Sequence, residues 1–137
     1  MPSEIPAACS APDILVVDDH EMTARSLVMV LRSAGYATEM AHSGADAMEK
    51  ASAAPPMCAV IDIHLPDLNG LVLSSKLRQQ LGPDVPLLVL SGDTSLETIR
   101  TLPHVGATYF LSKPVNSTRL LELIRGWLPM PRSRAQA

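Results

Sequence analysis

At 137 residues and 47% hydrophobic content, the chain has the size and composition of one globular domain with a substantial core. A net charge of −3 and an aromatic content of 3% exclude a generally basic, base-stacking nucleic-acid surface. No stretch approaches the roughly 20 apolar residues of a membrane span, and the start lacks the pattern of a signal peptide. Two cysteines, Cys9 and Cys58, form no disulfide framework. We therefore expect a cytoplasmic protein that binds neither membranes nor nucleic acid directly.

Short apolar runs alternate with helical patterns in the first half of the chain, which indicates βα units around a parallel sheet. The helical patterns place apolar residues at intervals of three and four. The expected elements are a strand at 14–17, a helix with the apolar stripe Ala24, Leu27, Val28 and Leu31 that stops at Gly35, a strand at 36–41, and an alanine-rich helix from Ser43-Gly44 to before Pro55.

The second half continues the same alternation. The expected elements are a strand at 57–61, a loop at 62–70, a helix with Leu73, Leu77 and Leu81 closed by Gly82-Pro83, a strand at 86–90, a short helix with Leu96, Ile99 and Leu102 bounded by Pro103 and Gly106, a strand at 107–112, and a helix with Leu120, Leu123, Ile124, Trp127 and Leu128 on one face. Continuous apolar runs are typical of strands buried on both faces. We also expect five methionines to fill the core: Met22, Met29, Met40, Met48 and Met57.

This order predicts a single α/β domain of five βα units over residues 13–128, with right-handed crossovers. Residues 1–12 are expected to form a flexible tail, and residues 129–137 a disordered tail or linker.

Polar side chains stand where the apolar runs end. They are Asp18-Asp19 after the first run, Asp62 after the third, Ser91 after the fourth and Lys113 after the fifth. Taken singly, they have ordinary interpretations as helix caps, turn formers or a solvated lysine. Together they are more informative, because the carboxyl ends of parallel strands meet at one edge of a sheet.

Three carboxylates at that edge would repel one another unless a cation joined them, and oxygen ligands suit Mg2+. A carboxylate can also act as a nucleophile and form an aspartyl phosphate. The Ser91 hydroxyl and the Gly92 amide offer donors to an anion. These residues therefore suit phosphoryl chemistry.

Several segments resemble the receiver domain of two-component response regulators, which is CheY-like. The matching segments are Asp18-Asp19, Asp62 to Gly70, Ser91-Gly92, and Gly106-Ala107 leading to Lys113-Pro114. The resemblance covers about residues 13–128 and implies a flavodoxin-like, doubly wound sheet with strand order 2-1-3-4-5.

The resemblance implies a role for each matching residue. Asp62 would accept the phosphoryl group in the presence of Mg2+, held directly by Asp19, through water by Asp18, and by Asp62 and the His64 backbone carbonyl. The phosphoryl group would contact the Lys113 and Ser91 side chains and the backbone amides of Ile63 and Gly92. Ser91 and Phe110 would form the switch, and Pro114 would follow a cis peptide bond.

The resemblance also implies a signalling module that catalyses only its own phosphorylation and dephosphorylation. Its donor would be a histidine kinase or a histidine phosphotransfer protein. An unknown downstream partner would bind the face made by the fourth helix, the fifth strand and the last helix. Whether the protein forms a homodimer on phosphorylation is left undecided by the sequence.

Two departures from the family pattern bear on the site. Phe110 stands where the family often has tyrosine, and the adjacent Tyr109 should point to the other face of the strand. His64 and Asp93 lie two residues after Asp62 and Ser91, where we expect them to tune the phosphoryl lifetime in a direction the sequence does not give.

The sequence leaves other functions and domain contexts open. The chain could act alone, or be a receiver module excised from a hybrid sensor kinase or multidomain regulator. A flavodoxin-like small-molecule binder would need a hydroxyl- and glycine-rich phosphate loop after the first strand, whereas Asp18-Asp19-His20-Glu21 repels phosphate without a metal. A phosphatase-like hydrolase with Asp62 as nucleophile usually has a second acid where this chain has His64.

Overall fold

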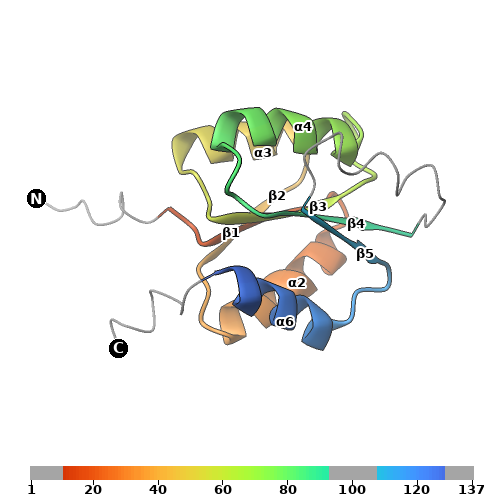
Figure 1. The fold of residues 1–137 in the computed structure, drawn as a ribbon. Helices are drawn as coiled ribbons and strands as arrows, with labels where there is room; N and C mark the ends of the chain where they lie inside the picture. Colours follow the sequence, from red (N-terminus) through yellow and green to blue (C-terminus); the bar gives the residue numbers. More distant parts are fainter. Residues whose placement is uncertain (1–10, 93–107, 129–137) are drawn as a thin grey trace, which may run out of the picture.

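A five-stranded parallel sheet forms the centre of the protein. The computed structural model describes residues 11–92 and 108–128. The strands are β1 (Ile14–Val17), β2 (Thr38–Ala41), β3 (Cys58–Asp62), β4 (Leu87–Ser91) and β5 (Tyr109–Ser112). Their order across the sheet is β2-β1-β3-β4-β5, and every neighbouring pair is parallel, which confirms the predicted topology (Figure 1).

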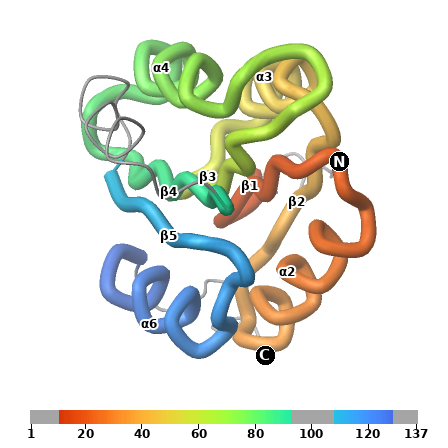
Figure 2. The backbone as a smooth tube through the Cα atoms, turned by 90° about the vertical axis from the view of Figure 1, so that its right-hand side faces the viewer, coloured from red at the N-terminus to blue at the C-terminus, as the bar shows by residue number. Residues whose placement is uncertain are grey.

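Helices cover both faces of the sheet. The described helices are α2 (Glu21–Ser33), α3 (Gly44–Ala53), α4 (Gly70–Leu81) and α6 (Ser117–Trp127). Helices α2 and α6 lie on one face, and α3 and α4 lie on the other (Figures 1 and 2). The short helix expected around Leu96 to Leu102 lies outside the described residues.

Alternate strand residues build two separate core layers. Ile14 and Val16 of β1 pack into the cluster that includes residues of α2 and α6, whereas Leu15 and Val17 pack into the cluster with α3 and α4. Successive strand side chains point to opposite faces, so one apolar run supplies both layers. The predicted burial on both faces is thus confirmed for β1, β3 and β4, whose residues are all buried.

The same prediction is wrong for β5. Tyr109 is 36% exposed, Phe110 and Leu111 are half-buried, and Ser112 is exposed. Among the described strands, β5 lies at one edge of the sheet and pairs with β4 alone. An edge strand has a neighbour on one side only, so an apolar run there does not imply complete burial.

The apolar stripe predicted for α2 is confirmed, because Ala24, Leu27, Val28 and Leu31 are all buried. The prediction that all five methionines fill the core is wrong for two of them. Met22 is 76% exposed and Met29 is 68% exposed. Both occupy helical positions away from the buried stripe, so the phase of the helix decides their exposure rather than their apolar side chains.

The second strand begins at Thr38, later than predicted. Tyr36 instead donates its backbone N–H to the Leu31 carbonyl and closes the end of α2, after Gly35 with φ 99°. Its ring is buried in the core beside α2. The tyrosine therefore belongs to the helix end and the core rather than to the strand.

Among the described helices, none combines the length and apolarity needed to cross a bilayer. The predicted tails fall largely on residues 1–10 and 129–137, outside the described part of the chain.

Candidate functional site

Backbone hydrogen bonds of the sheet hold the polar residues at one edge. Asp18 follows β1 and donates its N–H to the Ala41 carbonyl, 3.0 Å away. Asp62 ends β3, in register with Leu90 of β4. Lys113 follows β5 and donates its N–H to the Ser91 carbonyl at 2.9 Å. The sheet itself therefore sets where these side chains start.

The three acids converge as predicted. One carboxylate oxygen from each of Asp18, Asp19 and Asp62 lies within 4.8 Å of the others. Asp18 is 1% exposed and Asp62 is 4% exposed, whereas Asp19 is exposed. Burial raises the pKa of Asp18, the His20 N–H opposes this rise, and the nearby Asp62 charge adds to it. Keeping all three carboxylates ionised therefore costs free energy unless a cation lies close to them.

The Lys113 ammonium group places a positive charge beside the acid cluster. Its Nζ lies 3.1 Å from Asp62 Oδ2 and 3.9 Å from Asp18 Oδ2. The peptide bond between Lys113 and Pro114 is cis, as predicted. One ammonium group therefore serves two buried carboxylates.

One oxygen of this cluster accepts no hydrogen bond from the described residues, although Lys113 Nζ lies 3.9 Å away. Asp18 Oδ1 accepts the His20 N–H at 2.8 Å, but Asp18 Oδ2 is buried and has no hydrogen-bond partner among the described residues. A buried polar atom without a partner is costly and calls for an explanation. Three clustered carboxylates with an unpartnered oxygen form a hard, all-oxygen donor set, and such a set fits Mg2+.

The His64 backbone amide contacts the Asp62 side chain. The His64 N–H donates to Asp62 Oδ1 at 3.2 Å. The Ile63 N–H donates to the Leu90 carbonyl at 2.9 Å and so takes part in the sheet, and its contact with a phosphoryl group stays a prediction. Ile63, the first residue after β3, still forms a sheet hydrogen bond with β4. The amide of the next residue, His64, points to the Asp62 carboxylate. No sequence pattern marks the His64 amide, because its position depends on how the chain turns where β3 ends.

The predicted switch residues occupy different environments. Ser91 is completely buried, whereas Gly92 is exposed and a Cβ there would meet no atom of the described residues within 4 Å. Phe110 is half-buried against Ile63 and Val89. Asp93 lies outside the described residues. The switching roles of Ser91 and Phe110 stay predictions.

Tyr109 points away from Phe110, as the alternation of a strand predicts. Its ring lies 6.1 Å from that of Trp127, and its hydroxyl oxygen accepts from the Arg119 guanidinium at 2.7 Å. Tyr109 is therefore tied to α6, and Phe110 packs with Ile63, which follows β3, and with Val89 of β4.

A profile described as the response regulator receiver domain matches residues 14–125. The chain belongs to this family. This receiver domain is 39% identical over 106 residues to the photosynthetic apparatus regulatory protein RegA of Rhodovulum sulfidophilum, covering 77% of the chain and 57% of RegA. It is 36% identical to the sensory/regulatory protein RpfC of Xanthomonas campestris, covering 81% of the chain and 16% of RpfC.

The fold agrees with the same assignment. The structure of a CheY-like receiver domain protein from Methanospirillum hungatei JF-1 superposes with a TM-score of 0.79 at 30% identity, covering 90% of this chain and 97% of that one. The protein is therefore a signalling module of phosphorylation-based two-component systems. Receiver domains interact with histidine kinases or phosphotransfer proteins and generally bind Mg2+ in an acidic pocket. The chain spans little more than half of RegA and a small part of RpfC.

The unpartnered oxygen leads to a stability prediction for Asp18→Asn. In Mg2+-free buffer the variant should be more stable than wild type by on the order of 1 kcal/mol, because a neutral amide replaces a buried carboxylate beside Asp62. Added Mg2+ should then stabilise wild type and leave the variant nearly unchanged. Urea unfolding with and without Mg2+ measures both effects. The control Asp46→Asn removes a carboxylate outside the cluster; an equal response to Mg2+ in Asp18→Asn and wild type would contradict this account.

Proposed function

We propose that this receiver domain accepts a phosphoryl group on Asp62 from a phosphohistidine donor, with Mg2+ held by Asp18, Asp19, Asp62 and the His64 carbonyl. One observation carries the proposal: Lys113 Nζ lies 3.1 Å from Asp62 Oδ2, beside the buried, unpartnered Asp18 Oδ2. Asp62 thus lies between a fixed lysine and an oxygen set suited to a metal.

The chemistry follows from these positions. A carboxylate oxygen of Asp62 attacks phosphorus, the P–N bond of the donor breaks, and its electron pair returns to the donor imidazole, which takes a proton from solvent. Bound Mg2+ would supply positive charge that offsets the negative charge of the carboxylates and the phosphoryl oxygens. Lys113 contributes a second positive charge from the chain itself, and the His64 N–H holds Asp62 Oδ1 in place.

The proposed response uses the new negative charge on Asp62. Ser91 and Lys113 would contact the phosphoryl group, and Phe110 would become more buried. Phe110 is half-buried now, so part of its side chain still contacts solvent and can become buried. A ligand shifts such an equilibrium only through contacts that differ between the two states. The downstream partner would bind a face that includes β5 and α6, where Tyr109 is exposed.

The direct test is to incubate the wild-type protein with acetyl phosphate and Mg2+ and to measure its intact mass. Uptake of one phosphoryl group that is released by hydroxylamine and blocked by a chelator is expected. Peptide mapping after borohydride reduction should place it on Asp62. A label on another residue, or equal uptake without Mg2+, would refute the proposed site.

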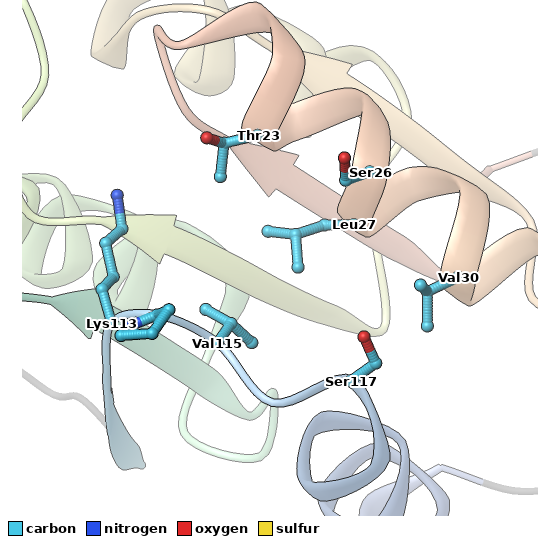
Figure 3. Close-up of a pocket in the computed structure, with 8 residues that line it drawn as sticks. Thr23, Ser26, Leu27, Val30, Lys113, Val115 and Ser117 are labelled. Carbon is cyan, nitrogen blue, oxygen red and sulfur yellow. The ribbon is translucent and has the colours of Figure 1, made fainter.

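The donor should dock on α2. A groove with a cavity volume of about 540 Å³ runs between α2 and the segment from Lys113 to Ser117 (Figure 3). Lys113 lines this groove and also contacts Asp62, so the groove opens beside the phosphoacceptor. Met22 and Met29 stand exposed on the same helix. Flexible, polarisable methionine side chains suit a surface that adapts to a partner.

This assignment predicts that a variant with both Met22→Glu and Met29→Glu takes phosphoryl groups from a phosphohistidine protein about tenfold more slowly, the loss of one modest apolar contact region. Its uptake from acetyl phosphate, which needs no docking surface, should stay unchanged. The matched control is Val72→Glu, at an apolar residue of α4 that is 47% exposed on the opposite face of the sheet. Equal slowing with both donors would show that the methionines do not form the docking surface.

Family membership favours the receiver function over a flavodoxin-like small-molecule binder and over a phosphatase-like hydrolase. Whether this receiver acts alone or within a hybrid sensor kinase or multidomain regulator stays a prediction, as does a homodimer that forms on phosphorylation.

A further inference from the structure

Asp67 ties the loop after β3 to a helix on the same side of the sheet. Its two carboxylate oxygens accept the backbone N–H groups of Gly44 and Ala45 at 2.8 and 2.9 Å. These residues begin α3, where N–H groups lack partners within the helix. The helix already has its own cap, because Ser43 Oγ accepts the Asp46 N–H. Asp67 therefore provides a second cap from a distant segment.

Packing around Gly44 is built for this contact. A Cβ at Gly44 would lie 2.6 Å from Leu68 Cδ2 and 3.2 Å from Asp67 Oδ1, so a side chain there would force the Leu68 and Asp67 side chains to shift. Leu65 and Leu68 pack against the core layer of α3 and α4. The Gly44 and Ala45 N–H groups lower the pKa of Asp67, because their hydrogen bonds favour the ionised carboxylate.

The base of the loop is held independently. His64 and Asn69 form an isolated antiparallel bridge, and the Gly70 N–H donates to the Ile63 carbonyl at 2.7 Å. Asn69 also caps α4 by accepting the Leu71 N–H. His64 thus belongs to the hydrogen-bonded base of the loop, and Asp67 holds the tip that follows it in the chain.

We propose that Asp67 is a positioning residue for the metal site, because its two hydrogen bonds to α3 hold the loop that presents the His64 carbonyl. The inference rests on the proposed function, in which that carbonyl is a Mg2+ ligand. Residues that orient metal ligands affect affinity without touching the ion. Helix α3 contributes none of the proposed ligands. Its N-terminal N–H groups would support the Mg2+ site through Asp67.

The test compares Asp67→Ala and Asp67→Asn with Asp46→Ala as the matched control. Asp46 lies in the same first turn of α3, and its carboxylate accepts the His42 N–H and pairs with Lys50 instead of holding the loop. Calorimetric titration with MgCl2 should show a dissociation constant about tenfold higher for Asp67→Ala than for wild type. Asp67→Asn keeps the size and one acceptor oxygen, so it should show a smaller increase. Asp46→Ala should lower the melting temperature without weakening Mg2+ binding.

Acetyl phosphate uptake gives a second readout. The Mg2+ concentration for half-maximal uptake should rise in Asp67→Ala by the same factor, while the rate at saturating Mg2+ stays close to that of wild type. Unchanged Mg2+ affinity in a folded Asp67→Ala would overturn the inference, and so would an equal loss of affinity in Asp46→Ala. Wild type that binds Mg2+ but takes up no phosphoryl group would refute the proposed function alone, because the calorimetric comparison does not depend on uptake.

Discussion

Asp62→Asn is expected to reduce phosphoryl uptake from acetyl phosphate below detection. The amide has almost the volume of the carboxylate, and its oxygen can still accept the His64 N–H. It lacks the anionic oxygen that attacks phosphorus, so the acyl phosphate bond cannot form. The measurement is intact mass after incubation with acetyl phosphate and Mg2+. Circular dichroism of the same sample verifies that the variant is folded.

The control for this variant is Asp46→Asn, which exchanges a half-buried carboxylate on α3, outside the acid cluster. It should gain one phosphoryl group at the wild-type rate. Phosphoryl uptake by Asp62→Asn equal to that of the control would mean that another residue is the acceptor. In that case Asp18 and Asp19, the other members of the acid cluster, would be examined next.

Gly70→Ala is expected to lower the free energy of unfolding by about 2 kcal/mol and to weaken Mg2+ binding. A Cβ at Gly70 would lie 2.3 Å from the Asp62 carbonyl oxygen and 2.7 Å from Ile63 Cα. Both neighbours are backbone atoms in or beside β3, and they cannot rotate away as a side-chain tip can. Moving them displaces the phosphoacceptor and the loop that follows it.

Urea unfolding and Mg2+ titration of Gly70→Ala measure the two effects. The matched control is Gly126→Ala, another glycine in a helix, where a Cβ would meet no described atom within 4 Å. That control should become more stable by up to about 1 kcal/mol, because alanine favours the helix over glycine. Equal stability changes in the two variants would mean that the close approach at Gly70 is relaxed in solution.

Much of the fold could be predicted from local patterns. The runs that became β1, β3 and β4 are apolar throughout because both of their faces are covered by helices. The same pattern misled at β5, which has one neighbouring strand. Residue type also misled for Met22 and Met29, whose exposure follows from their phase relative to the buried stripe of α2. Composition indicates that a core exists, and geometry decides which residues enter it.

The sequence by itself determined which groups meet at the site, because parallel strands bring their carboxyl ends to one edge and each apolar run ends in a group suited to phosphoryl chemistry. Asp18, Asp62 and Lys113 could be assigned in this way. Only the tertiary structure decided which backbone amide faces Asp62 and that Asp67 caps α3. Those features depend on how the chain turns where β3 ends and on contacts between segments far apart in the chain, and neither leaves a periodic signal in the sequence.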